Sequence, residues 1–98
     1  MTEIKFEWDQ NKADSNIKKH GVTFTEAKSV FFDYFARLIP DPDSSIGEER
    51  FIILGKCSDS KVLVVCHCYK EPNETVRIIS ARKADKRERK QYEGFRYA

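Results

Sequence analysis

Residues that could act on an RNA phosphate recur at the ends of three strand-like runs. Glu49 and Arg50 open the first run, His67 and Lys70 close the second, and Arg77 lies near the start of the third. Cleavage of RNA without a metal needs a base for the ribose 2′-hydroxyl, an acid for the departing 5′ oxygen and positive charge beside the phosphate. These residue types therefore favour proton transfer by Glu49 and His67, with the three cations stabilising the phosphate.

The five residues can meet only if the three runs pair as neighbouring antiparallel strands. Residues 50–55, 62–69 and 75–82 are rich in Val and Ile, and short polar connections join them, which favours hairpins. In such a meander the start of the first run, the end of the second and the start of the third share one end of the sheet. We expect Tyr69 to face Thr75 and His67 to face Arg77, with both pairs projecting from the same side.

The third run leads into a helix crowded with cations, predicted over residues 83–96. Residues 77–98 contain eight Lys or Arg and three Asp or Glu, a net charge of +5, whereas residues 1–76 carry −3. A strand edge joined to a basic helix suits a polyanion, and RNA is the first candidate. Tyr69 or Tyr92 could stack on a splayed base. Ala84, Tyr92 and Phe95 are the predicted inward face of this helix.

The N-terminal half is predicted to supply one strand and two helices. After a strand at residues 4–8, Asp9 can cap a helix over residues 10–20 that Gly21 ends in a left-handed conformation. Thr23 and Glu26 have the spacing of a capping box at the start of a second helix. The predicted apolar stripes are thin on the first helix and wide on the second: Ala13, Ile17 and His20, then Phe24, Ala27, Val30, Phe31 and Tyr34.

Residues 36–39 are a further short strand candidate, and residues 40–47 form a loop by their Pro, Asp, Ser and Gly content. The resulting order predicts an α+β fold, with a twisted, mainly antiparallel sheet, two N-terminal helices and one C-terminal basic helix. A chain of 98 residues with 40% apolar content supports one domain over residues 1–98. The 12% aromatic content argues against disorder despite 35% charged residues.

Several classes of protein find no support in the sequence. There is no signal peptide and no apolar stretch approaching about 18 residues, so we expect a cytoplasmic protein without a membrane span. No nucleotide-binding or zinc-protease motif is present, and we expect neither a cofactor nor a metal. Cys66 and Cys68 should point to one face of their strand and His67 to the other, so buried free thiols are favoured over a metal clip.

Three simpler interpretations compete with catalysis. A single histidine at a strand end is usually structural, and Glu49 beside Arg50 is compatible with a solvated ion pair. The basic helix alone would suit a noncatalytic surface that binds phosphates. The same surface could instead bind an acidic segment of a partner protein.

Several segments together resemble the BrnT family of toxins, and the likeness spans nearly the whole chain. The segments include Phe6-Glu-Trp-Asp9, Lys19-His-Gly-Val22, Glu48-Glu-Arg50 and Arg77-Ile-Ile-Ser-Ala-Arg82. The resemblance implies a RelE-like fold and an endoribonuclease activity that halts translation. It also implies a hetero-oligomer with a BrnA-type antitoxin, a ribbon-helix-helix DNA-binding protein, in a bacterial type II toxin–antitoxin pair.

The family pattern marks Trp8, Lys19, His20, Glu49, Arg50, His67, Arg77, Ser80, Arg82, Glu88 and Tyr92 in this sequence. The candidate catalytic residues are Glu49, Arg50, His67, Lys70 and Arg77. The candidate RNA-binding residues are Trp8, Lys19, His20, Tyr69, Arg82, Lys86, Arg89 and Tyr92. After His67 the family commonly has threonine, a variable residue and arginine, whereas this chain has Cys68, Tyr69 and Lys70. A lysine keeps the charge but loses the planar, bidentate grip of arginine on phosphate, which is compatible with a weakened toxin.

Overall fold

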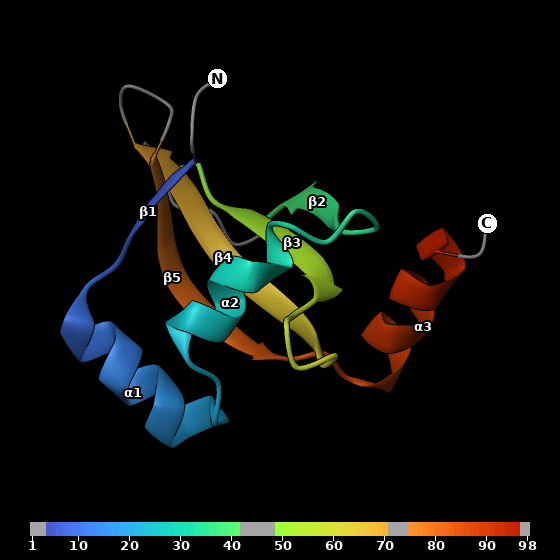
Figure 1. Cartoon of the computed structure of the whole chain (residues 1–98), viewed down its shortest axis with the longest axis horizontal. Coiled ribbons are helices and arrows are strands. Elements are labelled where there is room, and N and C mark those ends of the chain that lie inside the picture. The colour runs from blue at the N-terminus through green and yellow to red at the C-terminus, as the bar shows by residue number, and fades with distance from the viewer. Residues whose placement is uncertain (1–3, 42–48, 71–74, 97–98) are drawn as a thin grey trace.

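A twisted five-stranded sheet organises the computed structural model, which describes residues 4–41, 49–70 and 75–96 (Figure 1). The strands are β1 (Lys5–Glu7), β2 (Arg37–Pro40), β3 (Phe51–Lys56), β4 (Val62–Lys70) and β5 (Thr75–Lys83). Their order across the sheet is β1-β5-β4-β3-β2, and only the β1–β5 pair is parallel. The helices are α1 (Gln10–His20), α2 (Phe24–Val30) and α3 (Lys86–Arg96). The predicted α+β class, with its mainly antiparallel sheet, is confirmed.

The ends of α1 and α2 follow the predicted capping residues. The Asp9 carboxylate accepts hydrogen bonds from the backbone N–H groups of Asn11 and Lys12, and Gly21 ends α1 at φ 68°. At the start of α2, Thr23 and Glu26 satisfy each other's backbone amides as a capping box. Because these interactions are local in sequence, both helices begin where the sequence predicts.

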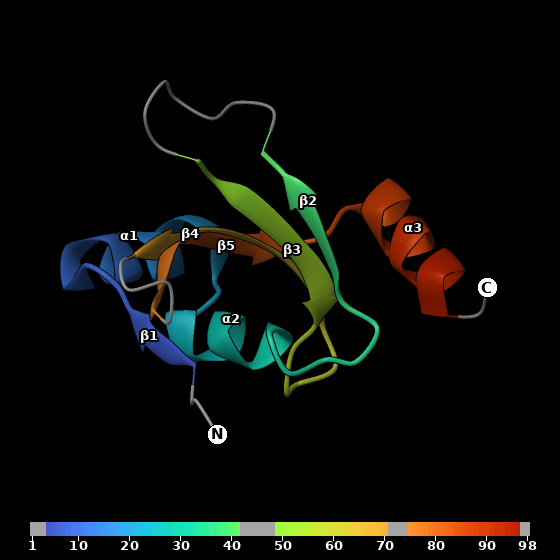
Figure 2. The same cartoon turned by 90° about the horizontal axis from the view of Figure 1, so that it is seen from above.

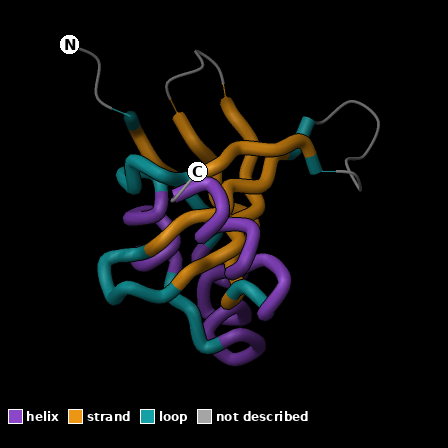
Figure 3. The backbone as a smooth tube through the Cα atoms, turned by 90° about the vertical axis from the view of Figure 1, so that its right-hand side faces the viewer, coloured by secondary structure: helices purple, strands orange, loops and turns teal. Residues whose placement is uncertain are grey.

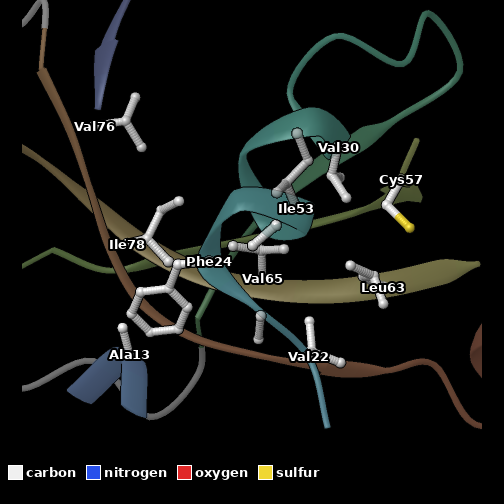
Figure 4. Packing of buried hydrophobic residues seen from close by; sticks show 12 residues of the cluster. Ala13, Val22, Phe24, Val30, Ile53, Cys57, Leu63, Val65, Val76 and Ile78 are labelled. Atoms are coloured by element: carbon white, nitrogen blue, oxygen red, sulfur yellow. The ribbon is translucent and has the colours of Figure 1, made fainter. Parts of the chain in front are cut away.

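Both N-terminal helices pack on one face of the sheet, and Figure 2 shows α3 standing apart from them. The core between them contains Phe24, Ala27 and Val30 of α2, together with Ile53, Leu63, Val65, Val76, Ile78 and Ala81 of the strands (Figure 4). Three predicted stripe residues, Ile17, His20 and Tyr34, lie outside this core. Ile17 is 45% exposed and Tyr34 is 92% exposed. Tyr34 falls outside because α2 ends at Val30, after seven residues.

Asn16 takes the buried position on α1 that the sequence analysis assigned to Ile17. Its Nδ2 donates to the carbonyl oxygens of Val22 and Ala81, at 2.9 and 2.8 Å, and its Oδ1 accepts from the Ala81 N–H at 3.1 Å. Strand β1 pairs with residues 75–77 of β5, and beyond that point no strand among the described residues lies along this edge of β5. The Asn16 amide stands in for that strand at Ala81 and fixes α1 against the sheet.

The opposite face of the sheet is only partly covered, by α3. Ala84 and Tyr92 pack there on Leu54 and Val64. The buried Tyr92 hydroxyl donates a 2.6 Å hydrogen bond to Asp33, which also accepts from the backbone N–H of Lys56. This anchor holds α3 at one end of the sheet and leaves the rest of that face open. Figure 3 gives a side view of the helices and strands.

No helix among the described residues is long and apolar enough to cross a membrane. Most of the predicted 40–47 loop, and the connection between β4 and β5, lie outside the described residues.

Candidate functional site

An extra residue in β5 determines which side chains reach the open face of the sheet. Cys66 pairs with Ser80 and His67 pairs with Ile78, which leaves Ile79 without a partner on β4. Such a bulge lets two successive residues point to similar sides before alternation resumes. Ala81 consequently lies in the helix-covered core, while Ser80 and Arg82 line the open face.

The open face is hollowed into a trough of about 370 Å³ beside the bulge. We call it the open-face trough. Its lining combines four apolar residues with two arginines, an imidazole, a carboxylate, a thiol and a hydroxyl. The lining residues are His20, Asp41, Arg50, Ile52, Val64, Cys66, Ile79, Ser80, Ala81 and Arg82. Apolar side chains combined with a few convergent polar groups are the usual composition of a ligand site.

A second hollow, the α1 groove, adjoins the trough on the edge of β5. It is lined by Asn11, Lys12, Ser15, Asn16, Lys19, His20, Ile79 and Ser80. Three of these residues, His20, Ile79 and Ser80, line both hollows. Lys12 and Lys19 therefore extend the cationic surface beyond the trough. The two hollows together form a path along which a polyanion could run.

Arg82 is held at the rim of the trough by α3. Its Nη1 and Nη2 each donate a 2.8 Å hydrogen bond to one oxygen of Glu88. Glu88 also accepts from the Asp85 N–H, and Asp85 accepts from the Glu88 N–H, so the same carboxylate completes a capping box at the start of α3. The hydrogen-bonded pair raises the pKa of Arg82 and lowers the pKa of Glu88.

Asp41 and Cys66 form a further contact in the trough. The Cys66 thiol donates to the Asp41 carboxylate at 3.5 Å. Burial, followed by the hydrogen bond and charge of Asp41, raises the pKa of Cys66 to about 11. The sulfur therefore stays protonated at neutral pH, as a thiol of low reactivity.

The predicted convergence of the five candidate catalytic residues in one pocket is wrong. The β4–β5 hairpin is shifted by one residue from the expected register: Lys70, rather than Tyr69, pairs with Thr75, and Cys68, rather than His67, pairs with Arg77. A shift of one residue exchanges the two faces of a strand. His67 is therefore on the helix-covered face, whereas Arg77 shares the open face with Cys68.

His67 is a core residue with no exposed surface. Its ring packs edge-on against Phe31 of α2, with 4.7 Å between centroids, and lies beside Phe51 and Tyr69. Nδ1 lies 3.3 Å from the Val65 carbonyl oxygen and Nε2 lies 3.4 Å from the Tyr69 hydroxyl. Burial lowers the pKa of His67, because the imidazolium form would lose its hydration.

Of the other four candidates, only Arg50 lines the trough. Arg77 forms an ion pair with Glu7 of β1. Lys70 is the exposed last residue of β4, and Glu49 is exposed ahead of β3. The alternation of Cys66 and Cys68 to one face and His67 to the other is confirmed. Among the described residues, no three His, Cys, Asp or Glu side chains gather as metal ligands would.

The candidate RNA-binding residues separate into four groups. His20, Lys19 and Arg82 line the two hollows, and Lys86 and Arg89 are exposed on α3. Tyr69, which is 41% exposed, is available for a contact at the end of β4.

Two aromatic candidates are engaged in the fold. Trp8 is partly buried edge-on against Phe24, with 5.8 Å between ring centroids. Tyr92 is 2% exposed, so the prediction that it could stack on a base is wrong, whereas its predicted inward position is confirmed. Its spacing with Ala84 and Phe95 along the helix already indicated burial.

Sequence reasoning missed Asp41 and Cys66 as residues of a common site. The sequence predicts that Asp41 lies in the 40–47 loop and that Cys66 is a buried thiol. Their contact crosses from the segment after β2 to β4, between residues 25 positions apart, so no local pattern predicts it.

Comparisons with known proteins were made by sequence and by structure. A family model described as the ribonuclease toxin BrnT of type II toxin–antitoxin systems matches residues 8–88. No curated protein matches the sequence. Among solved structures, the chain is similar to the 1.1 Å crystal structure of the Brucella abortus ribonuclease toxin BrnT, with a TM-score of 0.64 and 23% identity. The likeness covers 88% of this chain and 100% of that one, and it supports the described fold.

Proposed function

This chain belongs to the BrnT family of ribonuclease toxins of type II toxin–antitoxin systems, and from that membership we propose that it is an endoribonuclease that cleaves RNA in the open-face trough. The observation that carries the proposal is the lining of the trough. Two guanidinium groups and an imidazole line it together with four apolar residues, on the face of the sheet that α3 covers only in part. Cleaved messenger RNA cannot be translated, so the proposed consequence is an arrest of translation.

Arg50 and Arg82 are the proposed phosphate-binding groups. A guanidinium presents several N–H donors in a plane and stays charged at any physiological pH, which suits the oxygens of a phosphodiester. Positive charge fixed beside the phosphate also stabilises the additional negative charge of the transition state. Lys12 and Lys19 in the α1 groove extend the binding surface to a neighbouring phosphate.

His20 is the proposed general base. Histidine is the side chain used most often for proton transfer, and His20 is the one histidine that lines the trough. In the proposed step it takes the proton of the ribose 2′-hydroxyl as that oxygen bonds to phosphorus. The bond from phosphorus to the 5′ oxygen breaks, and this oxygen takes a proton from solvent in the open trough. The products are a 2′,3′-cyclic phosphate and a free 5′-hydroxyl.

We propose that this reaction needs no metal ion. The 2′-hydroxyl is an internal nucleophile, and the two arginines supply the positive charge that a metal would otherwise provide. DNA should resist cleavage because it lacks that hydroxyl. Glu49, His67, Lys70 and Arg77 have no direct part in this mechanism.

The proposed partner is a BrnA-type antitoxin with a ribbon-helix-helix fold, bound in a toxin–antitoxin hetero-oligomer in the cytoplasm. Covering Arg50, Arg82 and the exposed cations of α3 would block access of RNA phosphates. Inhibition would then follow from simple masking of the site. A complex that left this cationic face open to RNA would contradict this part of the proposal.

The test compares an RNA oligonucleotide with a DNA of the same sequence, each incubated with purified protein in the presence of a chelator. We expect cleavage of the RNA alone, ending in a cyclic phosphate, and a loss of at least tenfold for Arg50→Ala and for His20→Ala. Lys61→Ala is the matched control, because Lys61 pairs with Glu26 outside the trough. Intact RNA in the presence of folded wild-type protein would refute the proposal.

A noncatalytic RNA-binding role is the second candidate. The observation that favours it is the position of His67 and Glu49, the two residues predicted to transfer protons, outside the trough. This role predicts binding that weakens steeply with salt, without cleavage. Binding would then be lost in Arg50→Ala and unchanged in His20→Gln.

A further inference from the structure

In the described part of the chain, two capping-box glutamates also bind a cation, and one of them lies at the trough. Glu26 caps α2 through Thr23 and pairs with Lys61 at 2.7 Å. Glu88 caps α3 through Asp85 and pairs with Arg82, through two hydrogen bonds of 2.8 Å. Each glutamate caps a helix and pairs with a cation, so the Glu26–Lys61 pair is a matched control for the effect of the Glu88–Arg82 pair on the trough.

The Arg82 side chain is held in one orientation by contacts on both sides of its guanidinium. Besides the two bonds to Glu88, Nη1 lies 3.3 Å from the Lys83 carbonyl oxygen. A guanidinium has five N–H groups in a rigid plane. The three contacts engage Nη1 and one N–H of Nη2, which leaves the Nε–H and the second N–H of Nη2. Because the group is planar, fixing one edge fixes the direction of these remaining donors.

Glu88 is itself held in place, so it can fix the orientation of the Arg82 side chain. Its Oε1 accepts from the Asp85 N–H at 2.9 Å, and α3 carries it from a helix anchored by Tyr92 and Asp33. A flexible arginine loses side-chain conformational entropy when it binds a phosphate, which weakens binding. An arginine that is already fixed in the folded protein loses less entropy at that step. The chain of contacts thus links the first turn of α3 to a donor at the rim of the trough.

We propose that Glu88 is a positioning residue for RNA recognition, which orients Arg82 toward a phosphate in the open-face trough. The inference rests on the proposed function and deepens it, because it gives α3 a second role besides that of a charged surface. Glu88 touches no substrate in this scheme and acts only through Arg82. Removing Glu88 should therefore matter only when Arg82 is present.

The experiment is a double-mutant cycle made of wild type, Arg82→Ala, Glu88→Gln and the double variant. Two quantities are measured: the affinity for a 2′-O-methylated RNA oligonucleotide, which resists cleavage, and the rate of cleavage of the unmodified RNA. We expect Glu88→Gln to lower affinity and cleavage roughly tenfold in the wild-type background, since misplacing a binding group has effects of this order. In the Arg82→Ala background it should have no further effect.

Two controls separate positioning from stability. Glu26→Gln removes the Lys61 pair while the glutamine oxygen can still cap α2, so it should leave affinity and cleavage unchanged. Asp85→Ala removes the cap from α3 but keeps the carboxylate that binds Arg82, so it should lower the melting temperature with little effect on RNA affinity. Melting curves of every variant establish that the folded fraction is the same under the conditions of the RNA measurements.

Three outcomes would overturn the proposal. An equal loss for Glu88→Gln in both backgrounds would mean that Glu88 acts on the fold rather than through Arg82. No loss, or a tighter affinity, would mean that Glu88 is idle or competes with phosphate for Arg82.

If the wild type binds the RNA without cleaving it, endonuclease function fails while the affinity cycle still decides the role of Glu88. If it does neither, both proposals fail together.

Discussion

The stability of this protein should fall as the pH drops below about 6.5, because of His67. The imidazole has no exposed surface and lies among the rings of Phe31, Phe51 and Tyr69. Burial lowers its pKa in the folded state, whereas in the unfolded chain it should titrate near 6.5. Below pH 6.5 the unfolded state therefore binds more protons than the folded state, and the free energy of unfolding rises with pH through this window.

The size of the effect follows from the one proton that the His67 imidazole binds in the unfolded state but not in the folded state. Each pH unit between the two pKa values changes the free energy of unfolding by at most about 1.4 kcal/mol. Between pH 7.5 and 5.5 the loss can reach about 1.4 kcal/mol, the limit for one imidazole that titrates near 6.5 in the unfolded chain and stays neutral in the folded one. The pKa of Glu26 is lowered to about 2, chiefly by its hydrogen bond with Lys61. Its contribution is lost only as the pH falls from about 4.5 toward 2, outside this window.

Urea unfolding at pH 7.5 and 5.5 measures the effect directly. His67→Gln should lower stability at both pH values and abolish most of the difference between them. His20→Gln is the matched control, because the chain has only two histidines, and it should retain the full difference. Equal stability of the wild type at the two pH values would refute the interpretation of His67 as a buried neutral side chain. So would a His67 ring found protonated at pH 6 by NMR.

Three further predictions concern the contacts that position the trough. Asn16→Ala should destabilise the protein by about 2–4 kcal/mol in urea unfolding, because it leaves the buried N–H and C=O of Ala81 without their side-chain partner; a change below 0.5 kcal/mol would contradict this role. Tyr92→Phe should cost about 1–2 kcal/mol in urea unfolding through the lost hydrogen bond to Asp33, and a loss below about 0.5 kcal/mol would contradict the anchoring role of that bond. Gly55→Ala should cost about 1–3 kcal/mol in thermal unfolding, since its Cβ would lie 2.9 Å from two side-chain carbons, and a neutral effect would indicate that these neighbours move freely.

Local sequence patterns predicted the elements of this fold well. Asp9, Gly21, Thr23 and Glu26 act within a few residues of their own positions, so their side-chain chemistry alone indicates where α1 and α2 begin and end. Runs of Val and Ile gave the three long strands to within about one residue at each end. The predicted strand at residues 36–39 is likewise β2, displaced by one residue.

Which side chains make up the site depends on how the strands pair, and local sequence patterns do not determine that pairing. The pairing of Lys70 with Thr75 depends on the hairpin connection, and the unpaired Ile79 depends on how β5 meets β4. An error of one residue in the hairpin register moves Arg77 between the face that carries His67 and the open face. Arg50, His20 and Arg82 were among the predicted site residues, but that they line one trough could only be seen in three dimensions.

The arrangement of β5 has a consequence for how this chain could change in evolution. Without Ile79, Ile78 would still oppose His67 and Ser80 would still oppose Cys66, now as direct neighbours in ordinary alternation. Deletion of this one residue would leave the register of the other β4–β5 pairs unchanged. The strand would straighten, and one wall of both hollows would disappear. Relatives that lack a residue at this point should therefore keep the same architecture while presenting a differently shaped surface to whatever they bind.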